Sequence, residues 1–230
     1  MRPMISPGGG PVPGVPSQQP TNLFRYGETA LYSTFAFAQN TALANSQNRV
    51  FATPLGQNGQ GFTQALTRTE TNLKEGGRIP SGQAYDVYGV AGQIIGGDAV
   101  VGVAGPGTLD EPFNDNVATV QSLQNIINTA VLQWDFTQTV VDICPIMLAG
   151  AGGGNYGAIA QNAAGANSGA MNNGNGGIWM YRRNPVALPG NTTFAVLITF
   201  GSRAAPIPAG FSVSVRVVLL GYYKSVIEIG

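Results

Sequence analysis

The sequence predicts an all-β fold, an antiparallel sandwich or barrel. Residues 193–200 and 211–220 alternate apolar and polar side chains, which is the pattern of a half-buried antiparallel strand. A loop rich in Pro and Gly, residues 201–210, separates these two runs, so we expect them to pair as neighbours. From residue 50 onward a single helical stripe interrupts the strands, whereas a parallel fold needs a helix after nearly every strand.

The N-terminal segment predicts an arm rather than part of this domain. Residues 1–20 interleave six prolines with glycine, a composition that disfavours both helices and central strands. The Ala-rich residues 23–46 predict a helix, because Leu31, Phe35, Ala38 and Ala42 have helical spacing. The stretch around Phe35 and Phe37 also alternates as a strand does. We therefore expect an arm with a helix over residues 1–48 and a β-sandwich domain over 49–230.

Within the domain, residues 131–143 predict one half-buried strand. Its expected apolar face is Leu132, Trp134, Phe136 and Val140. Just before it, Val117, Val120, Leu123, Ile127 and Val131 form a helical stripe that Asn116 can cap. Weaker alternation predicts further strands over 62–73, 84–95 and 178–184, and residues 222–229 are expected to continue the preceding strand or to form a further one.

The charge composition favours self-association. Charged residues make up 10% of the chain, and eleven basic residues balance eleven acidic ones, so the surface repels other copies weakly. No block of basic residues is present, and strong direct nucleic-acid binding is therefore not expected.

The residue types leave little room for common enzyme chemistry. The chain contains no His, which excludes Ser-His-Asp and Cys-His catalytic arrangements. The single cysteine, Cys144, lies in the apolar run 140–148 and is expected to be a buried, inert thiol. Asp110, Glu111 and Asp115 form an acidic group that offers oxygen ligands to a cation such as calcium, but a solvated loop is the preferred interpretation. We predict no enzymatic activity, no catalytic residue, no metal site and no cofactor.

A glycine motif supports one remote alternative. Gly152, Gly154 and Gly157 have the GxGxxG spacing of dinucleotide-binding loops. Residues 158–181 contain no Asp or Glu to hold a ribose, and residues 149–177 are dominated by Gly, Ala and Asn. We therefore expect a long inter-strand loop that neighbouring subunits order, and a nucleotide-binding enzyme is the remote alternative.

One group of residues suggests a contact between subunits. Trp179, Tyr181, Arg182 and Arg183 lie close together in residues 178–184, and aromatic residues and arginine are enriched at interface hot spots. A solvated strand end is the competing interpretation of the arginine pair.

The order of elements resembles a known family. A Pro/Gly-rich arm is followed by "FTQALTRTETNL", "RIPSGQAYDVYGV", a helix, "AVLQWDFTQTVVDI", a long loop, "NPVALPGNTTFAVLITF" and "IPAGFSVSVRVVLLGYY". Across roughly residues 60–225 this order is similar to that of the jelly-roll major capsid proteins of tailless icosahedral viruses, in particular bacteriophages with an internal membrane. The resemblance rests on strand order and turn texture.

The resemblance implies an eight-stranded single jelly-roll sandwich with one or two short helices. It also implies a coat protein, made in the host cytoplasm, that assembles into capsomers and an icosahedral virion shell. Its partners would be copies of itself, with minor capsid or penton proteins and an internal membrane as further candidates. Arg2 is the one charged residue of the first twenty, which argues against genome neutralisation by the arm.

Two further alternatives remain open at this stage. The first is a trimeric phage spike or receptor-binding head, because a β-sandwich serves many functions. The second is a compact double jelly roll, although the body is short for two sandwiches.

Overall fold

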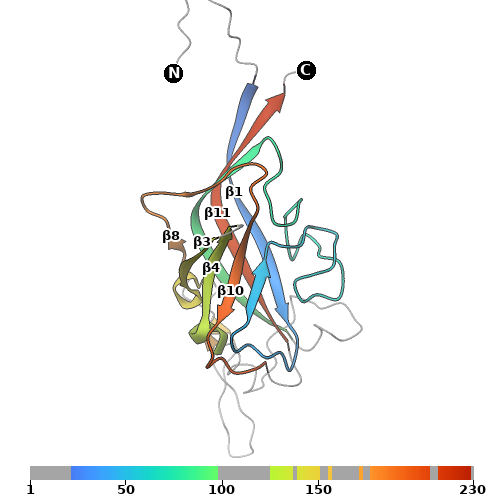
Figure 1. The fold of residues 1–230 in the computed structure, drawn as a ribbon, viewed down its shortest axis with the longest axis vertical. Coiled ribbons are helices and arrows are strands. Elements are labelled where there is room, and N and C mark those ends of the chain that lie inside the picture. The colour runs from blue at the N-terminus through green and yellow to red at the C-terminus, as the bar shows by residue number, and fades with distance from the viewer. Residues whose placement is uncertain are drawn as a thin grey trace, which may run out of the picture.

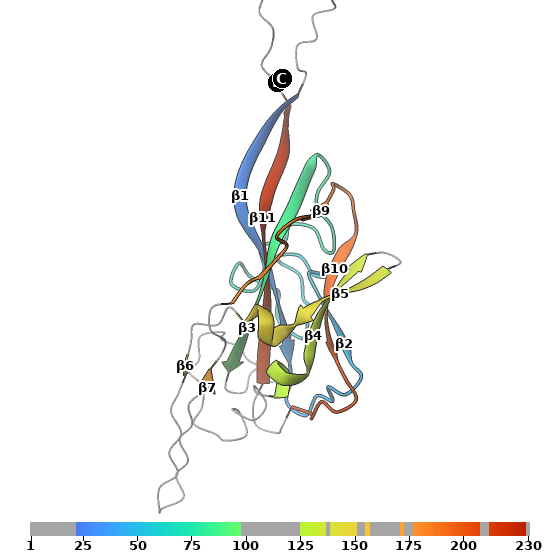
Figure 2. The same ribbon diagram turned by 90° about the vertical axis from the view of Figure 1, so that its left-hand side faces the viewer.

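Two antiparallel sheets pack face to face and enclose one hydrophobic core (Figures 1 and 2). The computed structural model describes residues 22–97, 125–136, 139–150, 155–156, 171–172, 177–207 and 212–228. Over these residues the chain is mostly β-strand, which confirms the prediction of an all-β antiparallel fold.

The larger sheet, sheet A, has the strand order β1-β11-β3-β8, and β9 also pairs with β3. Its strands are β1 (Asn22–Phe37), β3 (Gln83–Gly97), β8 (Trp179–Met180), β9 (Val186–Leu188) and β11 (Ser212–Glu228). In Figure 2 the long strands β1, β11 and β3 form one layer.

The second sheet, sheet B, has the order β2-β10-β4-β5. Its strands are β2 (Gln47–Val50), β4 (Ala130–Phe136), β5 (Thr139–Pro145) and β10 (Phe194–Phe200). A 3-10 helix, η1 (Ile146–Ala149), follows β5, and the short strands β6 (Asn155–Tyr156) and β7 (Met171–Asn172) pair with each other. Of the helix predicted over 117–131, residues 125–129 are helical, whereas Ala130 and Val131 belong to β4.

The core lies between the sheets and follows the alternation of the strands. In β10, Phe194, Val196 and Ile198 are fully buried, because a strand directs every second side chain to the same face. The apolar face of β11 is buried in the same way, and it consists of Val213, Val215, Val217 and Leu219. The inward faces predicted for these two runs are confirmed, although Ala195 and Leu197 of β10 and Ser212 and Ser214 of β11 are also buried, so these strands are not half-exposed throughout. The strand predicted over 84–95 is confirmed, and residues 222–228 continue β11.

The helix predicted within the arm of residues 1–48 is wrong. Residues 22–37 form β1, which pairs with β11 along its whole length. Leu31 and Phe35 satisfy both a helical and a strand spacing, but Phe35 and Phe37 alternate, and Phe37 is 1% exposed in the core. The segment forms a strand rather than a helix because the long strand β11 pairs with it. The β-sheet therefore begins well before residue 49.

Two other strand predictions need correction. Residues 131–143 form two strands, β4 and β5, paired as a hairpin, and Val140 is 51% exposed rather than on the core face. The runs 193–200 and 211–220 are not neighbours, because β10 pairs with β2 and β4 while β11 pairs with β1 and β3. Loop 201–210 joins strands of opposite sheets.

The strand predicted over 62–73 does not form, and of the strand predicted over 178–184 only β8 is present. Residues 60–72 instead run beside β1 and hydrogen-bond to it largely through side chains. Asn72 accepts from the Tyr32 N–H at 2.9 Å and donates to the Ala30 carbonyl at 2.7 Å. Thr71 donates its hydroxyl to the Tyr32 carbonyl at 3.1 Å.

Gln60 anchors this segment from a buried position. Its amide donates to the Ser33 hydroxyl at 2.8 Å and to the Thr34 carbonyl at 2.6 Å, and its carbonyl oxygen accepts from the Thr53 N–H at 3.2 Å. Next to it, Gly61 has φ +83°, and a Cβ there would lie 1.8 Å from the Ala36 carbonyl oxygen. Only glycine allows this close approach. The outer edge of β1 is therefore covered, a common protection of edge strands.

Several predictions lie outside the described residues. These are the Pro-rich arm over 1–20, the first part of the helix predicted over 117–131, and most of the Gly-rich loop over 149–177. Among the residues that are described, no helix is both long and apolar enough to span a membrane.

Asn72→Ala should expose the edge of β1. The change removes both side-chain hydrogen bonds to the strand, so we expect the free energy of unfolding to fall by about 1–2 kcal/mol. Hydrogen exchange at the Tyr32 amide should accelerate. The control is Asn58→Ala, which removes an exposed bond to the Thr63 carbonyl within the same segment. Equal exchange at Tyr32 in both variants would contradict the edge-covering role.

Candidate interaction surface

The four predicted interface residues divide into two pairs. Trp179 belongs to β8, opposite Val90 of β3, and the Tyr181 N–H donates to the Tyr88 carbonyl at 2.8 Å. Both aromatic side chains are partly buried against the core. They therefore belong largely to the interior of the subunit.

Tyr181 links the two sheets. Its hydroxyl oxygen accepts a 2.8 Å hydrogen bond from the indole N–H of Trp134, a residue of β4 that is 2% exposed. Burial raises the pKa of Tyr181, partly offset by this bond. Because a buried indole N–H needs an acceptor, Tyr181 is a structural partner of Trp134.

Arg182 and Arg183 form the other pair, and both are exposed. Within the described part of the chain, neither makes an ion pair or a hydrogen bond. They remain available for a contact with another molecule, as the sequence predicts for this group.

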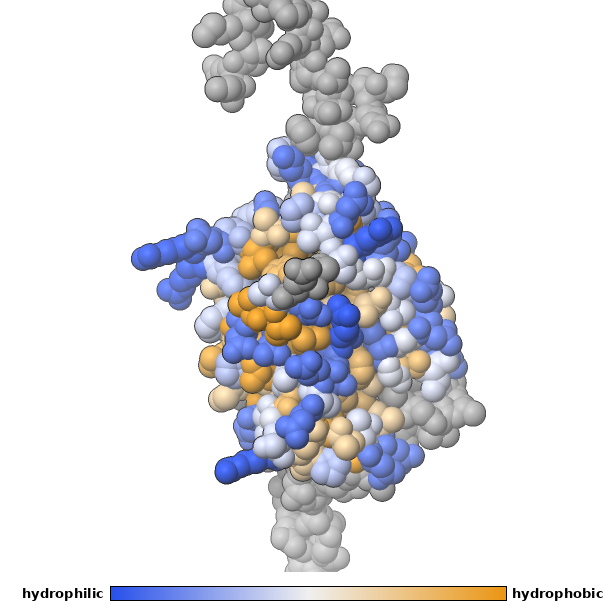
Figure 3. Space-filling view, in the orientation of Figure 1, coloured by the Kyte–Doolittle hydropathy of each residue, from blue (hydrophilic) through white to orange (hydrophobic). Residues whose placement is uncertain are grey.

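A larger apolar surface lies beside them, at one side of the sandwich. We call it the β5–β8 side. It consists of Val140 and Val141 of β5, Met147 and Leu148 of η1, and Ile178 and Met180 at β8, each between 42% and 55% exposed. Figures 1 and 2 show β5, η1 and β8 on the same side of the molecule. In Figure 3 apolar residues gather on the left half of the face, where β8 lies in Figure 1.

Val141 shows that this side of the sandwich is open. It stands directly opposite Trp134 in the β4–β5 ladder, so both side chains lie on the inner face of sheet B. Trp134 is 2% exposed, yet Val141 is 47% exposed. The inner face of β5 is therefore uncovered at Val141, whereas Cys144, opposite Leu132, is buried further along the strand.

The edge of β5 is open as well. Among the described strands it pairs with β4 alone, and it forms an end of sheet B. An edge strand presents unpaired backbone N–H and C=O groups to a partner. Apolar side chains next to such groups make an association surface.

The outer face of sheet B is polar, in contrast. Asp135 forms a 2.9 Å ion pair with Arg49 of β2. Gln133 donates to Asp142 at 2.6 Å and accepts from Thr199 at 2.6 Å. These contacts follow the predicted polar face of β4, and the exposed Val140, opposite Asp135, is the apolar side chain of β5 on this face.

Cys144 is buried, at 4% exposure, as the sequence predicts. Burial raises the pKa of its thiol to about 11. The neutral thiol is a poor nucleophile, so Cys144 acts as a packing residue.

The other predicted chemical features lie outside the described residues. These are the acidic group Asp110, Glu111 and Asp115, and the glycines Gly152, Gly154 and Gly157. Over the described part of the chain, no three His, Cys, Asp or Glu side chains come close enough together to hold a metal ion.

Sequence reasoning missed most of the β5–β8 side. The adjacent valines at 140 and 141 break strict alternation, and this irregularity was a signal that both faces of one strand carry apolar side chains. Met147 and Leu148 gave no comparable signal, because they continue an apolar run that also fits a core.

Comparisons with protein-family models, with curated proteins and with solved structures found no match to this chain. The assignment of function therefore rests on the fold and the surfaces described above.

Tyr181→Phe should destabilise the subunit, whereas the double change Arg182→Ala and Arg183→Ala should not. Loss of the hydroxyl leaves the Trp134 N–H buried without an acceptor, which costs about 1–3 kcal/mol. Exposed arginine changes stay within about 0.5 kcal/mol. Urea unfolding followed by tryptophan fluorescence measures both. A larger loss in the arginine variant would contradict the division into two pairs.

Cys144 should resist thiol reagents in the folded protein. With its pKa raised to about 11, about one thiol in a thousand is ionised at pH 8. We expect iodoacetamide to modify the native chain at least about a hundredfold more slowly than the urea-unfolded chain. Mass spectrometry gives an unambiguous signal because the chain has one cysteine. Equal rates in the two states would contradict the burial of the thiol.

Proposed function

We propose that this chain is a structural coat protein that assembles with copies of itself into the shell of a tailless icosahedral virus. The single observation that carries the proposal is the open β5–β8 side, where an inward-facing valine and its apolar neighbours stay exposed. The fold, the charge balance and the lengths of the strand edges support it further.

We also propose that the sandwich is a single jelly roll. The pairings are nested in the sequence: β1 with β11, β2 with β10, β3 with β8 and β9, and β4 with β5. This is the order that a long hairpin takes when it is wound into two facing sheets. Jelly rolls are frequent in viral capsid domains, and the nesting supports that topology over other sandwiches.

One sandwich accounts for all the described strands of sheets A and B. Their inner faces contribute to one core cluster, which supports a single jelly roll over the compact double form.

The edges of the sheets favour β5 as the contact strand. β2 has 4 residues and β8 has 2, whereas β5 has 7. Residues 60–72 cover β1 from Ala30 to Ala36. Short or covered edges resist pairing with other chains, so β5 is favoured over β2 and β8 as the contact strand. A contact there buries apolar surface at each subunit, and a shell repeats that contact many times.

The charge balance supports copies of the same chain as the main partner. With eleven basic and eleven acidic residues, like subunits approach without net repulsion. The same balance gives no attraction to a phosphate backbone. The proposal includes minor capsid or penton proteins and an internal membrane as further partners, and the virion as the place where the protein acts.

Assembly state tests the proposal directly. Light scattering and negative-stain microscopy of the purified chain, over a range of salt and protein concentrations, should show closed shells or flat capsomer arrays. Isolated trimers would favour a spike or receptor-binding head instead. A monodisperse 23.8 kDa monomer under all conditions would overturn the proposal.

Val141→Asp should block assembly without unfolding the subunit. The valine is 47% exposed in the free subunit, but a contact at the β5–β8 side would bury the new carboxylate. We expect the critical concentration for assembly to rise at least about tenfold. The matched control is Leu55→Asp, an apolar side chain 40% exposed in the segment after β2. Equal assembly of the two variants would argue against this surface.

A further inference from the structure

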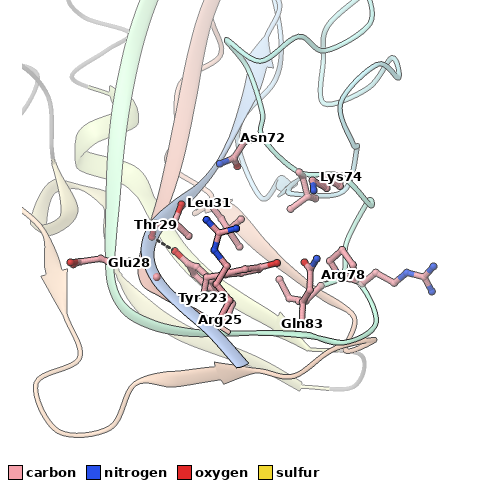
Figure 4. A pocket seen from close by; sticks show the side chains of 14 residues that line it. Arg25, Glu28, Thr29, Leu31, Asn72, Lys74, Arg78, Gln83 and Tyr223 are labelled. Carbon is pink, nitrogen blue, oxygen red and sulfur yellow. Dashed lines mark hydrogen bonds between the residues drawn. The ribbon is translucent and has the colours of Figure 1, made fainter. Parts of the chain in front are cut away.

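A pocket of about 350 Å³ lies at the opposite edge of sheet A from β8. Its walls are the β1 residues between Arg25 and Leu31, the segment 72–83, the start of β3, and Tyr223 of β11. Figure 4 shows this space between β1 and the segment that crosses beside it. The volume is at the lower end of the range for small-molecule sites.

The floor of the pocket is a row of residues across three strands. Gly27 of β1 stands opposite Tyr223 of β11, which stands opposite Tyr85 of β3. Tyr85 is 1% exposed, and its hydroxyl shares its one proton between the carbonyls of Thr29 and Leu219, at 2.5 and 2.8 Å. These bonds fix its ring, and the floor is rigid.

Gly27 and Gly221, two glycines of neighbouring strands here, differ in what surrounds them. A Cβ on Gly221 would lie 2.6 Å from the Tyr85 ring, so the protein itself occupies that space. A Cβ on Gly27 would meet nothing within 4 Å. A glycine inside a strand weakens it, and often marks a close approach of a ligand or another backbone. No described residue fills the space above Gly27.

The inner wall is apolar. Leu73 and Ile79 are 3% and 4% exposed, and Leu31 packs against the core. Together with the rings of Tyr85, Tyr223 and Pro80 they offer a surface suited to a flat apolar group.

The mouth of the pocket carries positive charge. Arg25 and Lys74 make no ion pair or hydrogen bond within the described residues, and Figure 4 shows the Arg25 guanidinium directed into the space. Arg78 is bound to Glu75 at 2.6 Å and points away. The lining carboxylate, Glu28, also points away and accepts a hydrogen bond from the Tyr88 hydroxyl. This bond raises the pKa of Tyr88 to about 12, so it persists at neutral pH.

We propose that this pocket binds a small apolar carboxylate, with a ring-bearing body on Gly27 and the inner wall and its carboxylate between Arg25 and Lys74. An arginine fork suits a carboxylate and also stacks on flat rings. The site lies at the edge of sheet A opposite the β5–β8 side, so the proposal does not depend on assembly.

A matched series of naphthalene compounds tests the charge requirement. Isothermal titration calorimetry should show binding of 2-naphthoate to the full chain. Naphthalen-2-ylmethanol, which is neutral, should bind more weakly, and the ammonium analogue 2-naphthylmethylammonium should bind most weakly. Equal binding of the three probes, or none by 2-naphthoate, would overturn the proposal.

Gly27→Phe tests the location. The new side chain enters open space and should abolish 2-naphthoate binding while leaving the thermal unfolding midpoint unchanged or raised. The control is Gly201→Phe, because Gly201 also has nothing within 4 Å of its added Cβ but does not line the pocket. Unchanged binding in Gly27→Phe would overturn the proposal.

A second variant keeps the test decisive if Gly27→Phe does not fold. The double change Arg25→Gln and Lys74→Gln removes two exposed charges. It should weaken 2-naphthoate binding about five- to tenfold and leave naphthalen-2-ylmethanol binding unchanged. An equal loss for both probes, or no loss for 2-naphthoate, would contradict the role of the cations.

Discussion

The hydrogen bonds from residues 60–72 to β1 cover the edge of sheet A from Ala30 to Ala36. Gln60, Thr71 and Asn72 satisfy backbone and side-chain groups of β1 that would otherwise face solvent. Sheet A is thereby covered along this stretch of its edge. Residues 72–83 then continue beside the N-terminal part of β1, and the pocket lies between the two. The β1 edge is covered over this stretch, whereas the β5 edge of sheet B pairs with β4 alone among the described strands.

The sandwich is asymmetric as a result. Residues 60–72 cover part of the edge at β1. At β5, in contrast, the inner face of sheet B is not covered by sheet A near Val141, which is half exposed. In a free monomer this exposure has a cost, which a neighbouring subunit would remove. The polar contacts of Arg49 with Asp135 and of Gln133 with Asp142 keep the outer face of the same sheet hydrated. If subunits associate as proposed, this difference favours contact at the β5–β8 side.

The sequence predicted those elements whose patterns are long and unambiguous, and missed those decided by tertiary contacts. β3, β10 and β11 are long β-rich runs, and in β10 and β11 every second residue over most of the strand is a large apolar side chain. β1 was missed because the spacing of Leu31 and Phe35 fits both a helix and a strand. Pairing with β11 makes the segment a strand. Between β4 and β5 the sequence has no Gly, Pro or Asn, so nothing indicated that residues 131–143 would form two strands. Residues 62–73 alternate as a strand does, but their polar side chains bond to β1. In the predicted interface group, composition did not distinguish Tyr181, which bonds inward to Trp134, from the exposed arginines.

Gly27 and Gly221 show why the pocket was beyond sequence reasoning. Both are single glycines inside long strands, and no pattern separates them. The difference appears only when Tyr85 is placed: its ring covers Gly221 and its hydroxyl bonds across β11 to the Thr29 carbonyl. The space beside Gly27 stays empty, because the hydrogen bonds of Tyr85 hold β1, β3 and β11 in place around it. A ligand bound there would contact β1 and β11 together and stabilise their pairing by mass action. Because the β5–β8 side lies at the opposite edge, such binding would stabilise the folded subunit without competing with the proposed assembly.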